Sequence, residues 1–231
     1  MNNITELVFI IDKSGSRAGL ESDTIGGFNA TIKKHKKDKE NKAYVTTILF
    51  NTNFDMIHDR IDLSEIKQMK ESDYEVGGST ALLDAVGETI EHIKNIHKYA
   101  RPEDVPGKTL FVIITDGMEN ASHKYEHHQI KSMISAMREE RKWEFIFLGA
   151  NIEAEEVAES YGILRERSVN YHSDKRGTKA AWESINSAVS CCLESTRCCE
   201  SLGEVDWKKA IKEDCRKRQT RKYDIDDEDA A

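Results

Sequence analysis

The chain has 231 residues, of which 38% are hydrophobic, enough for one core of ordinary size and a C-terminal extension. Acidic residues outnumber basic ones by 42 to 34, and the resulting net charge of −8 argues against nucleic acid or an anionic membrane as the partner. No apolar run is long enough to span a membrane and the N-terminus lacks a basic signal region, so we expect a cytoplasmic protein.

Nearly continuous apolar runs predict four strands that are buried on both faces, as in a parallel sheet covered by helices. These runs are residues 6–12, 43–50, 109–115 and 144–149. Residues 54–61 alternate more plainly and follow the second run closely, which predicts an antiparallel edge strand. Residues 163–170 are a weaker strand candidate.

Apolar residues at helical spacing lie between these strands. The predicted helices are residues 23–37, with Asp23 as a cap, and residues 80–99, 125–141 and 152–161. Strands that alternate with helices of this length predict an α/β fold with a doubly wound, mostly parallel sheet and one antiparallel edge strand.

The composition changes beyond the last strand candidate. We expect a domain over residues 1–172 and a C-terminal helix over 173–203 that packs on the domain or extends it. Residues 204–231 contain a basic run followed by an acidic one and are expected to be a charged, flexible tail.

All the cysteines lie in this C-terminal part: Cys191, Cys192, Cys198, Cys199 and Cys215. A disulfide framework would spread through the fold, so reduced thiols are expected. Cys191 and Cys198 would lie two turns apart on a straight helix, too far for a disulfide. Buried small thiols are therefore favoured, and a zinc site would need a kink or a second chain.

Oxygen-bearing side chains follow two of the predicted strands and precede one predicted helix. Asp12, Ser14 and Ser16 follow the first strand, Asp116 follows strand 109–115, and Thr80 ends a glycine-rich segment before helix 80–99. Ligands of open α/β sheets bind beyond the carboxyl ends of the strands, so these segments are expected to meet. Hydroxyls and carboxylates without thiol or imidazole favour a hard cation, Mg²⁺ foremost.

Together, the segment Asp12-Lys13-Ser14-Gly15-Ser16, Thr80 and the pair Asp116-Gly117 resemble the von Willebrand factor A domain with its metal-ion-dependent adhesion site. The resemblance covers residues 5–170. Residues 26–32 and 78–85 also look like those of stand-alone bacterial and phage-type intracellular members. The resemblance implies the family fold and a non-catalytic binding module.

In that family the serines of the motif, here Ser14 and Ser16, ligate the ion directly. The resemblance implies that Thr80 also ligates directly in the ligand-competent arrangement, whereas Asp12 and Asp116 act through water and hydrogen bonds. An ion held mainly by neutral hydroxyls keeps much of its positive charge. We therefore expect a Mg²⁺ ion, with Mn²⁺ or Ca²⁺ as alternatives, that captures an Asp or Glu carboxylate of a partner protein.

Several residues beside the predicted ion are candidates for partner contact. They are Arg17, Gly78, Ser79, Gly117 and Glu119, and Tyr74, Glu75 and Tyr125 flank the same loops as rim or partner-facing residues. Arg17 replaces the Met that the family commonly has. Either its position is exposed and tolerant, or its guanidinium attracts the acidic ligand.

Two other classes of function stay open, a metal-assisted phosphohydrolase and a structural scaffold with an unused site. Asp12 resembles the nucleophile of haloacid-dehalogenase phosphatases, but those enzymes need a second acid at the position of Ser14. The first turn lacks G-x-G-x-x-G and no G-x-S-x-G occurs, which disfavours dinucleotide binding and esterase chemistry. His123, His127 and His128 are interpreted as exposed turn residues rather than zinc ligands. The partner, the pathway and the oligomeric state stay open.

Overall fold

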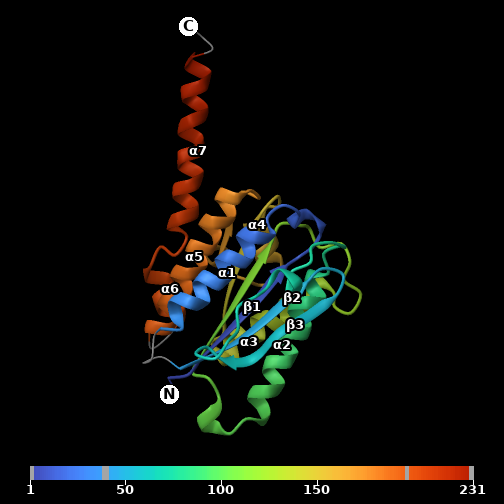
Figure 1. Cartoon of the computed structure of the whole chain (residues 1–231). Helices are drawn as coiled ribbons and strands as arrows, with labels where there is room; N and C mark the ends of the chain where they lie inside the picture. The colour runs from blue at the N-terminus through green and yellow to red at the C-terminus, as the bar shows by residue number, and fades with distance from the viewer. Residues whose placement is uncertain (1–2, 38–41, 196–197, 229–231) are drawn as a thin grey trace.

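The computed structural model describes residues 3–37, 42–195 and 198–228, with the side chains of 199–201 and 221–228 outside the description. Six strands form one sheet in the order β3-β2-β1-β4-β5-β6 (Figure 1). Their bounds are β1 Thr5–Asp12, β2 Ala43–Phe50, β3 Phe54–Asp62, β4 Lys108–Thr115, β5 Glu144–Gly149 and β6 Ser168–Asn170. Among these described strands β2 and β3 pair antiparallel, and the other neighbours pair parallel. The predicted fold class is confirmed, and the weak candidate at 163–170 supplies a three-residue strand.

Helices join and cover these strands. The helices are α1 Glu21–His35, α2 Leu82–Tyr99, α3 His127–Arg141, α4 Ala154–Ser160, α5 Lys175–Glu194, α6 Cys198–Glu204 and α7 Lys209–Glu228. The cap expected at Asp23 is wrong, because α1 begins two residues earlier and Leu20 precedes it. A short 3₁₀ turn, η1 Gly15–Arg17, connects β1 to α1 and leads the chain into the helix earlier than the apolar spacing indicates.

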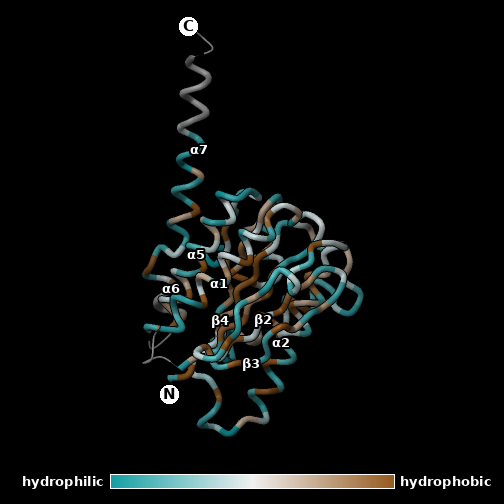
Figure 2. Tube along the Cα trace, in the orientation of Figure 1, coloured by the Kyte–Doolittle hydropathy of each residue, from teal (hydrophilic) through white to brown (hydrophobic). Residues whose placement is uncertain are grey.

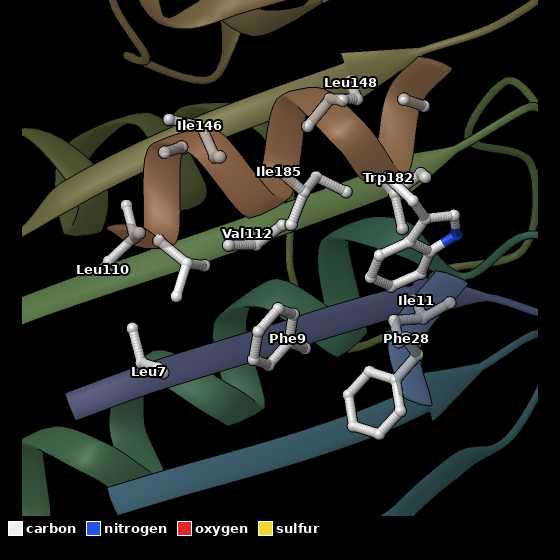
Figure 3. Close-up of a cluster of buried hydrophobic side chains, with 14 of the residues drawn as sticks. Leu7, Phe9, Ile11, Phe28, Leu110, Val112, Ile146, Leu148, Trp182 and Ile185 are labelled. Carbon is white, nitrogen blue, oxygen red and sulfur yellow. The ribbon is translucent and has the colours of Figure 1, made fainter. Parts of the chain in front are cut away.

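Both faces of the sheet are buried, which explains why its strands read as continuous apolar runs. Leu7, Phe9 and Ile11 of β1 point to the face that α1 and α5 cover (Figure 3). Val8 and Ile10 point to the opposite face, where they join the cluster that contains α2, α3 and α4 side chains. Figure 2 shows the hydrophobic residues concentrated along the central strands. The loops at the strand ends are thus mounted on a packed three-layer core.

The segment expected to be a charged, flexible tail contains the helix α7 over Lys209–Glu228, and its flexibility stays a prediction. The first half of α7 packs against α5, with Ile211 buried in the same cluster as the sheet. Arg218 forms two hydrogen bonds with Asp174, of 2.6 and 2.8 Å, and these lower the pKa of the Asp174 carboxyl to about 2. The composition of residues 204–231 shows only that the segment is charged and does not indicate these contacts between α5 and α7. The helix then continues beyond the body of the domain (Figure 1).

A break between α5 and α6 changes the arrangement expected for the cysteines. Because α5 ends at Glu194 and α6 begins at Cys198, Cys191 and Cys198 do not lie two turns apart on one straight helix. Cys192 and Cys198 belong to the same buried cluster. The Cys192 and Cys198 thiols are buried, whereas Cys191 and Cys215 are half-buried. The Cys199 side chain lies outside the described part. Across residues 3–37, 42–195 and 198–228, no helix combines the length and apolar character needed to cross a membrane.

Candidate metal site

The candidate site lies where the order of the strands reverses. The chain leaves β1 toward β2 on one side, whereas β4, the other neighbour of β1, leads toward β5 on the opposite side. The loops that follow β1 and β4 therefore diverge and leave a crevice at the carboxyl edge of the sheet, the usual ligand position in such folds. Ser14 and Ser16 lie in the first of these loops, and Asp116 and Gly117 lie in the second.

Three hydroxyl groups from two different loops surround one small space in this crevice. The Oγ atoms of Ser14 and Ser16 are 2.9 Å apart, and the Ser16 hydroxyl donates to Asp116 Oδ1 at 2.5 Å. A Cβ atom built on Gly117 would lie 2.8 Å from Thr80 Oγ1, 3.4 Å from Ser16 Oγ and 3.7 Å from Ser14 Oγ. The structure thus brings together the hydroxyls that the sequence singled out.

The two aspartates lie below these hydroxyls and are both buried. Asp12 Oδ1 accepts the Ser14 N–H at 2.7 Å, and Oδ2 accepts the Thr115 hydroxyl at 2.6 Å. Burial raises the pKa of Asp12, and the hydrogen bonds from Thr115 and Ser14 partly oppose that shift. Asp116 Oδ2 accepts the Ser173 hydroxyl at 2.9 Å. Hydrogen bonds from the surrounding loops therefore fix both carboxylates in place.

Backbone contacts hold the Thr80 segment against the other loops. Asn120 clamps Thr80 from both sides, since its Oδ1 accepts the Thr80 N–H at 2.9 Å and its own N–H donates to the Thr80 carbonyl at 3.1 Å. The Gly15 N–H donates to the Gly78 carbonyl at 3.1 Å. Gly78 has φ +74°, which glycine adopts without strain, so it allows this close approach.

Arg17 is not at the exposed position that one of its two interpretations expected. It is fully buried, not exposed, and its guanidinium points beneath the site. It donates to Tyr171 OH and Thr24 Oγ1, both at 2.7 Å, and it lies 3.5 Å from Asp116 Oδ2. The expectation of an exposed, tolerant position is therefore wrong, and a side chain held in this way cannot contact a partner directly. Attraction of an acidic ligand through the Arg17 charge stays a prediction.

Two other residues expected near the partner surface instead support the loops. Glu119 accepts backbone N–H groups from Leu83, Ala121 and Ser122 at 2.8–2.9 Å, so its carboxylate is fully engaged. Tyr74 is buried, and its hydroxyl donates to the Asp12 carbonyl. Three of the remaining flanking residues, Glu75, Gly78 and Ser79, are exposed, while Gly117 and Tyr125 are half-buried.

Ser173 and Asn120 contact the site but were not singled out from the sequence. Ser173 follows β6. The rule that ligands bind beyond the carboxyl ends of strands, applied to the weaker strand candidate 163–170, would therefore have pointed to Ser173. Asn120 carries no comparable signal, because an Asn in a loop is common. His123, His127 and His128 are exposed, and no group of three His, Cys, Asp or Glu side chains could hold a metal ion in the described part of the chain.

The residues present fit a hard divalent cation. The site offers hydroxyl oxygens from Ser14, Ser16 and Thr80 and two carboxylates nearby, which is the oxygen-only donor set that Mg²⁺ and Ca²⁺ prefer. The space between the hydroxyls is small enough that one methyl group on Gly117 would fill it. The role of these side chains as ligands stays a prediction, but their chemistry and placement agree with it.

Gly117→Ala is therefore expected to weaken Mg²⁺ binding at least about tenfold without removing any oxygen ligand. The added methyl would lie 2.8 Å from Thr80 Oγ1, and the Gly117 backbone has no positive φ that would strain an alanine. Isothermal titration with MgCl₂ would measure the change. Gly26→Ala is the matched control, because nothing lies within 4 Å of a Cβ at that position. Equal Mg²⁺ affinity in G117A and the wild type would contradict this placement of the ion.

Comparisons with known proteins identify the fold. Neither a family model nor a curated protein sequence matches this chain. The von Willebrand factor domain of the type V pili tip protein Mfa5 from Porphyromonas gingivalis is 9% identical, with a TM-score of 0.62 over 84% of this chain and 98% of that one. The PilB minor pilin from Streptococcus sanguinis is 11% identical, with a TM-score of 0.57 over 84% of this chain and 62% of that one.

A third similar structure holds a metal. Proximal thread matrix protein 1 from the mussel byssus, with a zinc-occupied MIDAS motif, is 11% identical, with a TM-score of 0.52 over 79% of this chain and 44% of that one. This chain spans less than two thirds of the PilB and mussel proteins. The fold is that of the von Willebrand factor A domain, as the resemblance in the loops implied.

Proposed function

We propose that this protein is a non-catalytic, Mg²⁺-dependent binding module that captures an Asp or Glu side chain of a partner protein. The observation that carries the proposal is the convergence of three neutral hydroxyls around one small space, above two buried carboxylates. Ser14, Ser16 and Thr80 would hold the ion, and Asp12 and Asp116 would orient the hydroxyls and water. A bound Mg²⁺, or Mn²⁺ or Ca²⁺ in its place, would supply positive charge and an open coordination position for the partner carboxylate.

The surroundings of Asp12 favour binding over phosphate hydrolysis. An aspartate nucleophile needs an accessible oxygen, but Asp12 is 1% exposed and both its oxygens accept hydrogen bonds. Ser14 stands where the haloacid-dehalogenase pattern requires an acid, so no side chain there would protonate a leaving group. We therefore propose that the protein is not an enzyme.

The similar structures give general support for a divalent ion and for a protein partner. One similar structure holds zinc in its MIDAS motif, and others are pilus proteins. We also propose a cytoplasmic location, because cysteines that all lie in the C-terminal part of the chain do not form the disulfide framework typical of secreted proteins. Oxygen ligands favour Mg²⁺ over zinc in this chain.

Ser14→Ala and Thr80→Ala are each expected to weaken Mg²⁺ binding at least about tenfold while changing the free energy of unfolding by no more than about 1 kcal/mol. Each variant loses one hydroxyl in a loop above an intact core. Calorimetric titration with MgCl₂ and urea denaturation would measure the two effects. Ser160→Ala is the matched control, because Ser160 is an exposed serine at the end of α4.

The binding activity itself can be tested with a short peptide that contains one Asp and the same peptide with Asn. Immobilised wild-type protein should bind only the Asp peptide, only with Mg²⁺, and should release it on addition of EDTA. Release of phosphate from a phosphomonoester in the presence of Mg²⁺ would favour the hydrolase instead. Binding of neither Mg²⁺ nor peptide would favour the structural scaffold.

A further inference from the structure

A fixed positive charge lies directly beneath the candidate metal site. The η1 turn directs Arg17 inward, and its side chain is 1% exposed. Three hydroxyl-bearing residues surround the guanidinium, with Tyr171 and Thr24 at 2.7 Å and Tyr74 at 3.5 Å. An arginine stays charged at every relevant pH, so this is a permanent cation.

These contacts hold the guanidinium in one position beside Asp116. Tyr171 and Tyr74 are themselves buried, and the Thr24 hydroxyl donates onward to the Leu20 carbonyl at 3.0 Å. Each of the three partners comes from a different segment, so moving the Arg17 side chain would disturb several packed elements. Contacts outside the proposed ion site therefore hold the charge 3.5 Å from Asp116.

Arg17 changes the balance of charge in the site. Asp12 and Asp116 together carry −2, and Arg17 reduces this to −1. A divalent cation would bring the total to +1, whereas without Arg17 it would bring the total to zero. Lys13, the nearest other cation in the sequence, pairs with Asp55 at 2.8 Å on β3. Charges in a buried site are poorly screened by salt, so one unit of charge matters there.

We propose that Arg17 sets the charge of the site so that it binds a divalent cation more weakly and then holds an anionic ligand more tightly. This inference rests on the proposed function, since it assumes that a cation binds at Ser14, Ser16 and Thr80. Like charges repel, so Arg17 opposes the incoming cation. The same charge attracts the carboxylate that completes the coordination. Arg17 thus lowers the affinity for the cation and raises the affinity for the anionic ligand.

Arg17→Gln is the informative variant, because glutamine is neutral yet can still hydrogen-bond to Tyr171 and Thr24. We expect R17Q to bind Mg²⁺ about tenfold more tightly than the wild type and the single-Asp peptide about tenfold more weakly at saturating Mg²⁺. Arg17→Met is a second neutral variant. Arg17→Lys keeps the charge, so it should change both affinities less than R17Q does. Calorimetry with MgCl₂ and peptide binding give the two readouts.

Arg167→Met is the matched control for loss of a buried arginine. Arg167 pairs with Glu144 at 3.0 Å, at the amino end of β5 and thus at the opposite edge of the sheet. This variant lowers the net charge equally but should leave both affinities unchanged. If R17Q acted only through the net charge or the overall stability, R167M would change the Mg²⁺ and peptide affinities in the same way as R17Q.

The outcomes separate the inference from the proposed function. If the wild type binds Mg²⁺ and the peptide but R17Q changes both affinities in the same direction, or neither, the inference is overturned and the proposed function stands. If the wild type binds no divalent ion, the proposed function itself fails. If both neutral variants fail to fold while R17K folds, the Arg17 charge serves the core alone and the inference is wrong. Circular dichroism of each variant without metal makes that distinction.

Discussion

Replacing Asp116 with alanine is expected to destabilise the metal-free protein by about 3 to 5 kcal/mol and to remove divalent-cation binding. Asp116 is buried, and it is the carboxylate that faces the buried guanidinium of Arg17, at 3.5 Å. Removing it would leave that cation uncompensated inside the protein and would leave the Ser16 and Ser173 hydroxyls without their acceptor. Most of the effect should come from the unpaired charge. Urea denaturation and titration with MgCl₂ would measure the two losses.

An exposed ion pair gives the matched control for Asp116→Ala. Asp55 pairs with Lys13 at 2.8 Å, but its side chain is 47% exposed, so Asp55→Ala should cost no more than about 1 kcal/mol. Adding R17Q to D116A should recover part of the lost stability, because no buried charge is then left unpaired. An unfolding free energy of D116A within about 1 kcal/mol of the wild type would show that Arg17 does not depend on this carboxylate.

Replacing Trp182 with alanine is expected to cost about 3 to 5 kcal/mol of the free energy of unfolding. Trp182 projects from α5 onto the sheet and packs edge-on against Phe28 of α1, with ring centroids 6.1 Å apart (Figure 3). A Cβ on Gly27 would lie only 2.2 Å from the Trp182 ring, so the two helices are in close contact here. Thermal and urea denaturation would measure the change, with Tyr99→Ala, at an exposed position, as the control.

Removal of α5 from the chain tests the contribution of that helix to the core more directly than W182A does. Residues 1–172 alone would lack α5 and would expose the face formed by Leu7, Phe9 and Ile11, so we expect no cooperative unfolding transition. A cooperative transition for this fragment, or a W182A variant as stable as the wild type, would contradict the view that α5 belongs to the core. In that case α5 would be an extension of an independently stable domain.

The position of Arg17 beneath the site should couple the binding of the cation to the binding of the partner. A site with two carboxylates and no nearby cation would be suited to holding a metal permanently. With Arg17 beneath it, the same site carries less negative charge and should depend more on the partner carboxylate for a stable complex. Metal and partner would then bind together, each increasing the affinity for the other.

The sequence by itself determined the layers of the fold and the position of the site. Residues 6–12 and 109–115 are nearly continuous apolar runs because both of their faces are buried, so the local pattern of apolar residues reports burial directly. Ser14, Ser16 and Asp116 could be placed at one edge because the carboxyl ends of parallel strands share an edge. Thr80 could be placed there because it opens the helix that leads to the next parallel strand. These inferences need only the order of the elements along the chain.

The tertiary structure alone decided what surrounds the site. Arg17 is buried because the η1 turn aims it at Tyr74 and Tyr171, which lie 57 and 154 residues further along the chain. The sequence indicates which face of an element a residue occupies, but a residue in a turn has no periodic face. The same holds for Ser173 and for the α7 helix, whose Arg218 meets Asp174 across 44 residues. Long-range partners depend on how the loops converge, and that is fixed only when the layers pack.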